Sequence, residues 1–218
     1  MTIDYSQARE MMVEQQVRPW DVLDLRVLEA LSTIKRENFV PEIHRTLAYA
    51  DMEIPLGNGQ RMMKPVVEGR TLQGLALESG DDVLEIGTGS GYLSACMGML
   101  AREVVSLEIR PDLAARARTQ LDASGHGGNV RIETADALHY TTDRRFDAIC
   151  VTAAVETLPA QFMQWLRPQG RLFLVRGYSP VMEAVLARHD VDGARFESLF
   201  ETDLPYLQGA APAPKFVF

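Results

Sequence analysis

Residues 83–92 read VLEIGTGSGY, an apolar run that leads into three glycines and then into a helical pattern. Gly87, Gly89 and Gly91 occupy every second position of this loop. Glycine tolerates positive φ angles and lets a ligand approach the backbone, while the amides at the start of the next helix face outward. Open α/β sheets bind ligands here, beyond the carboxyl end of a strand. The segment predicts either a ligand-binding loop or only a tight strand–helix turn.

Strand and helix patterns alternate around this loop. We expect strands at 82–86, 103–107, 130–133, 146–151 and 171–175, and helices at 69–78, 92–101, 111–123 and 159–166. Such alternation predicts a doubly wound, mainly parallel sheet covered on both faces, which is the Rossmann-like α/β class. Residues 181–189 and 196–204 flank the turn sequence DVDG, which predicts an antiparallel pair at the C-terminal edge of the sheet.

The N-terminal part has a different pattern and is predicted to be a helical extension. Residues 5–33 are expected to be helical, with a first helix over 5–17 that Pro19 stops and a second that Asp21 caps. Residues 38–68 are rich in proline and glycine, so we expect them to be mostly irregular. A loop region of this length in a compact domain is more often functional than idle.

We expect a single domain over residues 1–218, because the chain has no repeat, low-complexity tract or long polar linker. Its three parts are the N-terminal helices with an acceptor-site loop, a cofactor-binding core, and an antiparallel edge with a tail: 1–68, 69–175 and 176–218. The terminal aromatic residues Phe216 and Phe218 favour a tail that folds back over the sheet.

Composition and charge exclude several classes of protein. Thirty acidic residues against 22 lysines and arginines give a net charge of -8, which argues against nucleic acid and anionic membrane surfaces as partners. We expect no membrane span and no secretory signal, since neither pattern occurs. Cys96 and Cys150 lie in apolar stretches, so we expect buried thiols and a reducing cytoplasm. We also expect a monomer. The four histidines lack ligand spacing, and no metal is expected.

The spacing of the glycines excludes two common classes of ligand. The dinucleotide fingerprint needs glycine at its sixth position, but Tyr92 and Ser94 stand there when the count starts at Gly87 or Gly89. A triphosphate loop is excluded too, because no Gly-Lys-Ser or Gly-Lys-Thr follows. Glu85 just before the loop would repel a pyrophosphate and suits an ammonium group, while Glu108, ending the next strand, can accept both hydroxyls of a ribose. S-adenosylmethionine combines an amino group, a sulfonium and a ribose without phosphate.

Six segments of the chain resemble those of a known family: residues 85–92, 36–41, 48–51, 54–60, 146–154 and 166–172. Residues 85–92 resemble the first motif of class I S-adenosylmethionine-dependent methyltransferases. The other segments are similar to protein-L-isoaspartate O-methyltransferases, and segments 36–60 and 146–154 are the most specific to that branch. The resemblance implies an enzyme that esterifies the free α-carboxylate of L-isoaspartyl residues in damaged proteins and leaves S-adenosyl-L-homocysteine.

The resemblance also implies roles for individual residues. The loop that shapes the pocket for the methionine part comprises Gly87, Thr88, Gly89, Ser90 and Gly91, with Glu85 near the amino group. Glu108 would hold the ribose, and Asp136 would face the adenine amino group, with the backbone of Ala137 beside it. Thr152 would border the methyl group that is transferred.

One segment departs from the family pattern. Where that pattern has Gln-Thr-Ile-Ser, a variable residue and Pro, residues 60–65 read QRMMKP. Met63 therefore replaces the serine that is thought to position the acceptor, and Arg61 replaces the threonine. Three interpretations stay open: Arg61 or Lys64 contacts the acceptor carboxylate instead; the acceptor is different and the methionines line a more apolar pocket; or Met62 and Met63 only fill a gap beneath the loop.

Methyl transfer to a carboxylate does not require a strong general base from the protein. A carboxylate is already a nucleophile at pH 7, so alignment and exclusion of water supply most of the catalysis. Residues 57–70 contain three cationic side chains and one carboxylate, which predicts a locally basic surface on an acidic protein. The alternatives to isoaspartyl methylation are the same fold acting on another acceptor and a cofactor-binding protein without turnover.

Overall fold

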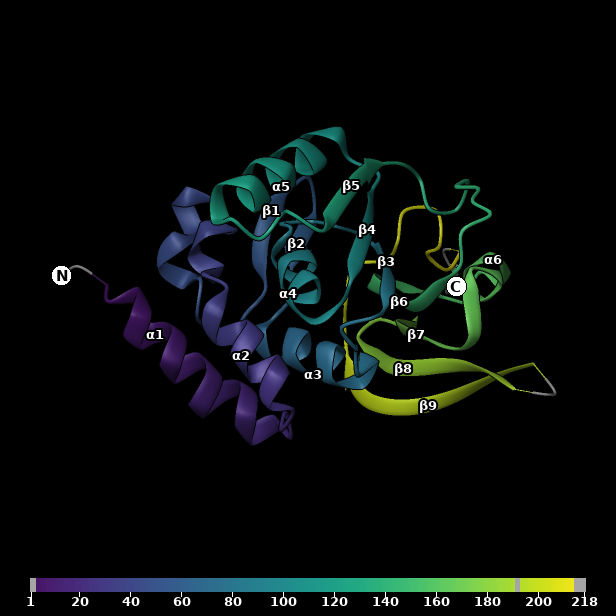
Figure 1. Ribbon diagram of the computed structural model, residues 1–218, viewed down its shortest axis with the longest axis horizontal. Coiled ribbons are helices and arrows are strands. Elements are labelled where there is room, and N and C mark those ends of the chain that lie inside the picture. Colours follow the sequence, from purple (N-terminus) through teal and green to yellow (C-terminus); the bar gives the residue numbers. More distant parts are fainter. Residues whose placement is uncertain (1–2, 191–192, 214–218) are drawn as a thin grey trace, which may run out of the picture.

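A seven-stranded sheet forms the core of the protein, as Figure 1 shows in a computed structural model that describes residues 3–190 and 193–213. Its order is β5-β4-β3-β6-β7-β8-β9. The bounds are β3 Asp82–Ile86, β4 Glu103–Glu108, β5 Val130–Thr134, β6 Phe146–Val155, β7 Leu166–Tyr178, β8 Val181–Asp190 and β9 Gly193–Thr202. Strands β5, β4, β3, β6 and β7 are parallel, and β8 and β9 continue the sheet in antiparallel pairing. The predicted fold class is confirmed.

Alternate residues of the parallel strands face two separate cores. Val83 on β3 and Val104 on β4 join one cluster, while their neighbours Leu84 and Val105 join the other. This is the two-residue period of an extended strand. Helices cover both faces, so β3 and β4 are buried along nearly their whole length, as expected for a parallel sheet.

Helices α3 and α4 lie between the N-terminal helices and the sheet, as Figure 1 shows. The α-helices have these bounds: α1 Tyr5–Met11, α2 Leu25–Thr33, α3 Pro65–Leu75, α4 Tyr92–Leu100, α5 Pro111–Ser124 and α6 Ala160–Gln164. Shorter helical segments are the π-helical turn Met12–Val17 and the 3-10 turns Arg18–Trp20, Arg36–Asn38 and Glu42–Leu47. Helix α6 covers the second core on the other face.

The N-terminal helices begin and end at other residues than predicted. The first helical stretch does not stop before Pro19 but continues to Trp20, because the proline sits at the start of a 3-10 turn, where its missing N–H costs no bond. Asp21 does not cap the second helix. It adopts a left-handed conformation (φ 61°) that ends the first stretch, and the cap is Asp24, whose side chain accepts the amide of Arg26.

Other predicted bounds also shift. Helix α3 begins at Pro65 rather than at residue 69, since proline is pre-set for the first helical position. Residues 38–68 contain a short antiparallel hairpin, β1 Ile54–Gly57 and β2 Gln60–Met62, in addition to the 3-10 turns. The predicted helix at 159–166 is only five residues long, and β6 and β7 extend beyond the predicted 146–151 and 171–175.

Cys96 on α4 and Cys150 on β6 are buried free thiols, and burial raises the pKa of both. Both side chains therefore remain protonated thiols, which are poor nucleophiles. Within residues 3–190 and 193–213, no helix has the length and apolar character to cross a membrane. The prediction that Phe216 and Phe218 dock concerns residues outside the described part.

Candidate cofactor and acceptor site

The glycine loop lies where three strands end. Gly87 follows β3, and its amide donates to the carbonyl of Leu107 on β4 at 2.8 Å. From β6, the hydroxyl of Thr152 donates to the carbonyls of Gly87 and Ile86 at 2.5 and 3.1 Å. Because β4 and β6 flank β3 on opposite sides, the loop stands at the point where the winding of the sheet reverses.

All three glycines of the loop have positive φ angles: 99° at Gly87, 55° at Gly89 and 84° at Gly91. Space is restricted as well. A Cβ atom at Gly87 would lie 2.4 Å from the Thr152 hydroxyl oxygen, and one at Gly91 would lie 3.1 Å from the Ala117 Cβ. Glycine is thus required here both for its backbone conformation and for close packing.

Seven of the predicted site residues line one cavity at the strand ends, which we call the strand-end cavity: Arg61, Gly87, Gly89, Glu108, Asp136, Ala137 and Thr152. Glu108 is buried, and its two carboxylate oxygens accept the amides of Gly89 at 2.8 Å and Arg110 at 3.0 Å. These bonds fix the orientation of the carboxylate. A fixed carboxylate is suited to accept hydroxyl groups from a ligand in the cavity.

The surroundings of Asp136 favour its ionised form. Burial opposes ionisation, but hydrogen bonds from His139 at 2.7 Å and from the amide of Leu138 at 2.9 Å outweigh it and hold the pKa of Asp136 below its ordinary value. The carboxylate therefore remains an acceptor at neutral pH. Ala137 follows it at the wall of the same cavity.

A second hollow, which we call the inner cavity, adjoins the glycine loop. Glu85, Thr88, Ser90, Met63 and Arg61 line it, together with residues shared with the strand-end cavity. Glu85 is fully buried on β3, and one of its oxygens accepts hydroxyls from Ser94 and, at 2.5 Å, from Ser106.

The other carboxylate oxygen of Glu85 has no hydrogen-bond partner among the described residues. Burial raises the pKa of Glu85 to about 8, which the bonds from Ser106 and Ser94 offset only in part. A buried carboxyl with an unfilled oxygen at the wall of a cavity is suited to a cationic group, since the cation would favour its charged form.

Thr88 and Ser90 hold the loop rather than leave it free. The hydroxyl of Thr88 is 2.5 Å from that of Ser106, and the Ser90 hydroxyl accepts the amide of Tyr92 at 3.2 Å. These bonds fix both ends of the turn into α4.

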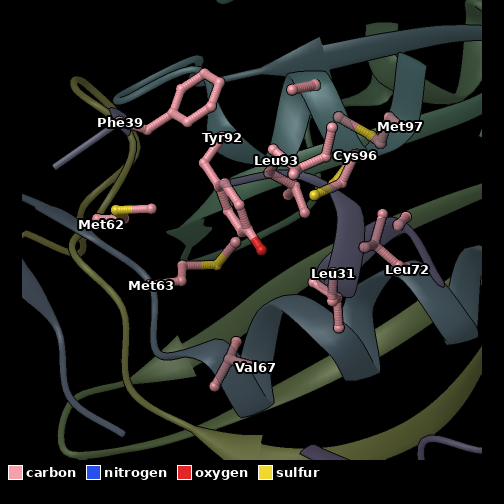
Figure 2. Close-up of a cluster of buried hydrophobic side chains, with 14 of the residues drawn as sticks. Leu31, Phe39, Met62, Met63, Val67, Leu72, Tyr92, Leu93, Cys96 and Met97 are labelled. Atoms are coloured by element: carbon pink, nitrogen blue, oxygen red, sulfur yellow. The ribbon is translucent and has the colours of Figure 1, made fainter. Parts of the chain in front are cut away.

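The predicted acceptor residues separate into two environments. Arg61 has a side chain that is 58% exposed, pairs with Glu53 at 3.0 Å and lines both cavities. Met63 is buried, and Figure 2 shows its side chain pointing toward the ring of Tyr92, within the hydrophobic core. Met63 both fills the core and borders the inner cavity, so the filling and lining roles coincide in one side chain.

Comparison with known proteins adds the family. The model of the family described as "Protein-L-isoaspartate(D-aspartate) O-methyltransferase (PCMT)" matches residues 7–195. The chain belongs to this family. A relative from Marinobacter nauticus, named protein-L-isoaspartate O-methyltransferase 2, is 37% identical over 205 residues, which cover 94% of this chain and 93% of the relative. One of the same name from Anaeromyxobacter is 41% identical over 170 residues, or 78% and 70% of the two chains.

Solved structures of the isoaspartyl methyltransferase type share the fold. A Plasmodium falciparum structure described as a protein-L-isoaspartate O-methyltransferase, in complex with S-adenosyl-L-homocysteine, superposes with a TM-score of 0.80 at 19% identity and covers 94% of this chain and 99% of its own. Another protein-L-isoaspartate O-methyltransferase gives 0.78 at 22% identity, covering 91% and 65%. The resemblance inferred from the sequence motifs is confirmed.

Two features of this isoaspartyl methyltransferase family member are not readable from its motifs. The first is Arg36, which is fully buried, pairs with Glu68 and donates to the carbonyls of Ala48 and Met63, each at 2.7 Å. It ties residues 60–64, which we call the acceptor loop after their predicted role, to α3. The only sequence signal is a charged residue inside segment 36–41, and that pattern does not indicate burial.

The second feature is the segment that follows β9. Near the end of β6, the amide of Ala154 donates to the carbonyl of Pro205 at 2.9 Å, and its carbonyl accepts the amide of Leu207 at 2.8 Å. Tyr206, between them, lines the strand-end cavity. Residues 205–208 thus form one wall of the site. The residue types of this segment do not indicate such a role, because the wall forms through backbone hydrogen bonds between residues about fifty positions apart in the chain.

Proposed function

We propose that this protein is an S-adenosylmethionine-dependent O-methyltransferase that esterifies the free α-carboxylate of L-isoaspartyl residues in damaged proteins and peptides. Family membership supports the reaction. The observation that carries the site is the pair of adjoining cavities at the glycine loop, one with the buried Glu85 and the other with the fixed Glu108.

The residues present fit S-adenosylmethionine, which when bound supplies a methyl group on a sulfonium. The loop has no side chain at Gly87 or Gly89 that would fill the approach to the backbone. We assign the unfilled oxygen of Glu85 to the ammonium group, Glu108 to the ribose hydroxyls, and Asp136 with the Ala137 backbone to the adenine. Thr152, held by the Gly87 carbonyl, borders the place of the methyl group.

The protein's part in the reaction is to orient the acceptor and exclude water. An ionised carboxylate needs no general base, so a side chain that holds it in line contributes most. Arg61 is the residue we assign to this task, because it lines both cavities and is itself oriented by Glu53. The ester forms on the acceptor oxygen, and S-adenosyl-L-homocysteine is released.

A second acceptor has one observation in its favour. Met63 is buried against Tyr92 and brings no hydroxyl to the position where the family pattern has serine. If that position is a barrier to isoaspartate, Met63→Ser should create or strongly raise isoaspartyl activity. If Arg61 already supplies the contact, the same substitution should leave the activity within a few-fold of the parent.

The deciding experiment is transfer of labelled methyl to an isoaspartyl peptide, with the aspartyl peptide as control. We expect incorporation only with the isoaspartyl peptide. Arg61→Ala should raise KM for the isoaspartyl peptide about tenfold with little change in kcat, and Arg61→Lys should recover part of this loss. Arg131→Ala, which removes an exposed arginine side chain from β5, is the matched control. Intact cofactor binding without incorporation above control would overturn the substrate assignment.

We further propose that residues 1–218 act as one catalytic unit, as a monomer, in the cytoplasm. The core over 69–175 alone lacks the acceptor loop and the wall at 205–208, so the three parts depend on each other. The two buried free thiols support a reducing compartment. Sedimentation velocity at micromolar concentration tests the monomer.

A further inference from the structure

A groove lies beside the acceptor loop, on the side away from the glycine loop. We call it the flanking groove, and the residues that define it are Trp20, Lys64, Arg70, Val181, Glu201 and Asp203. On two chain segments, neighbouring residues line the groove and one of the two cavities. Arg61 and Met63 line the inner cavity while Lys64 lines the groove; Pro205 lines the strand-end cavity while Leu204 lines the groove.

Apolar groups form the floor and part of the rim. Val66, Val67 and Leu204 are buried beneath the groove. At its rim, the apolar side chains of Trp20 and Val181 are 56% and 65% exposed. The aliphatic part of a long side chain can lie against such surfaces while its polar end stays in water.

The charged groups around the floor are mainly acidic. Four carboxylates line the groove, from Asp51, Glu53, Glu201 and Asp203, against the cations of Lys64 and Arg70. The segment around residues 57–70 is therefore less basic in the fold than in the sequence, because distant segments bring carboxylates to it.

Not all of these charges are equally available. Arg70 stacks over the Phe200 ring at 4.4 Å and donates to the carbonyl of Leu199, and Glu53 is engaged by Arg61. Asp51, Glu201 and Asp203 are exposed at the rim. A cationic side chain would meet carboxylates and an aromatic ring there, whereas an anionic one would be repelled.

We propose that the flanking groove binds a lysine or arginine side chain located next to the acceptor residue in the substrate peptide, and so makes the enzyme selective for basic flanks. This rests on the proposed function. A protein acceptor remains part of a chain, so residues beside the esterified one must leave the site across a neighbouring surface. The groove adjoins the loop that carries Arg61, and its charge is opposite to that of a basic flank.

The test uses isoaspartyl hexapeptides in which lysine, alanine or glutamate is placed at each of the two positions before and after the acceptor. At one position or more, we expect kcat/KM to fall about tenfold from lysine to glutamate, mostly through KM, and the ratio to shrink as ionic strength rises. Trp20→Ala should raise KM for the lysine peptide several-fold and change that for the alanine peptide little.

Charge reversal separates the groove from the general charge of the protein. Glu201→Lys should weaken or invert the preference for lysine over glutamate. Glu197→Lys makes the same change at an exposed position of the same strand outside the groove and should leave the preference intact. Equal effects of both variants would overturn the assignment.

The outcomes distinguish the inference from the function on which it rests. Methylation of the alanine peptide with no dependence on flanking charge would overturn the groove assignment and leave the proposed function standing. No methylation of any isoaspartyl peptide would overturn the proposed function, and the groove assignment with it.

Discussion

Gly87 stands where a side chain would collide with Thr152. We expect Gly87→Ala to destabilise the protein by about 1–3 kcal/mol from backbone strain alone, plus the cost of moving Thr152, and to weaken cofactor binding. Gly57→Ala is the matched control, because Gly57 has the same φ of 99° but nothing within 4 Å of its added Cβ. Urea unfolding and cofactor titration of both variants check this. Equal losses would show that the contact with Thr152 has no effect.

Glu85 links cofactor binding to pH. Burial raises its pKa to about 8, so near neutral pH the free protein holds it mostly protonated, and a bound ammonium group would favour the charged form. We expect cofactor affinity to rise between pH 6.5 and 8.5, by at most about tenfold per pH unit, with release of a proton. Calorimetry in two buffers of different ionisation enthalpy measures that proton. Glu85→Gln should bind more weakly and without the pH slope.

The same group affects the stability of the free protein in the opposite sense. Its folded pKa lies above the ordinary value of 4.5, so the folded state holds the proton more tightly than the unfolded state. The contribution of Glu85 to stability is fully present below pH 4.5 and is lost as pH rises through about 8. A slope of the opposite sign for wild type relative to Glu85→Gln would contradict the burial argument.

At the scale of elements, one buried side chain joins the acceptor loop to α3. Arg36 pairs with the buried Glu68 and also binds the carbonyls of Ala48 and Met63. Arg36→Met should cost about 3–5 kcal/mol, because it leaves the Glu68 carboxyl buried without its partner. It should also raise KM for the acceptor, since the loop that carries Arg61 loses an anchor. Urea unfolding and steady-state kinetics give the two readouts.

Two further variants test this interpretation. The double variant Arg36→Met with Glu68→Leu removes the uncompensated carboxyl and should recover part of the lost stability. Arg26→Met is the control, because the Arg26 side chain is half exposed and solvent screens its pair with Asp24, so its loss should destabilise the protein far less. An Arg36→Met protein as stable as Arg26→Met would contradict the role assigned to the buried pair.

Which parts of the fold were predictable depends on how far apart in the chain the deciding contacts lie. The strand 82–86, the glycine loop and α4 follow from local patterns of apolar residues and glycines, and the structure places them within a residue of the prediction. The cap of α2 was misplaced because Asp21 and Asp24 are chemically equal candidates. Only the turn geometry, with Asp21 left-handed, selects Asp24.

The site divides in the same way. Among the candidate site residues, Glu85 and Glu108 could be proposed from the pattern, because they lie near the carboxyl ends of two predicted strands, where parallel sheets place ligand contacts. Asp136 and Thr152 were proposed only through the family resemblance. The wall at 205–208 and the flanking groove could not be predicted, since they depend on pairing between segments far apart in the chain. A sequence pattern with a period of two or of 3.6 residues carries no information about such contacts.

At the scale of the whole molecule, the two ends of the sheet have different tasks. Asp82 begins β3 at the end opposite Gly87, and its buried carboxylate pairs with Arg102 at 2.6 Å, Arg167 at 2.8 Å and Arg144 at 3.5 Å. Burial opposes its ionisation, but the hydrogen bonds from Arg102 and Arg167 outweigh burial and hold the pKa of Asp82 below its ordinary value.

Asp82→Asn should therefore lower the free energy of unfolding at pH 7 by about 1–3 kcal/mol, the worth of hydrogen bonds between charged groups at a half-exposed network. Because the folded pKa is depressed, this stability is present above the ordinary pKa of 3.8 and is lost as pH falls through the folded value. In urea unfolding, the difference between the variant and wild type should therefore shrink as pH falls below 3.8. Cofactor affinity should not change, since the site lies at the other end of β3. Glu14→Gln, at an exposed pair with Arg18, is the control for a surface charge. A loss of cofactor affinity in Asp82→Asn without loss of stability would contradict this separation of the two ends of the sheet.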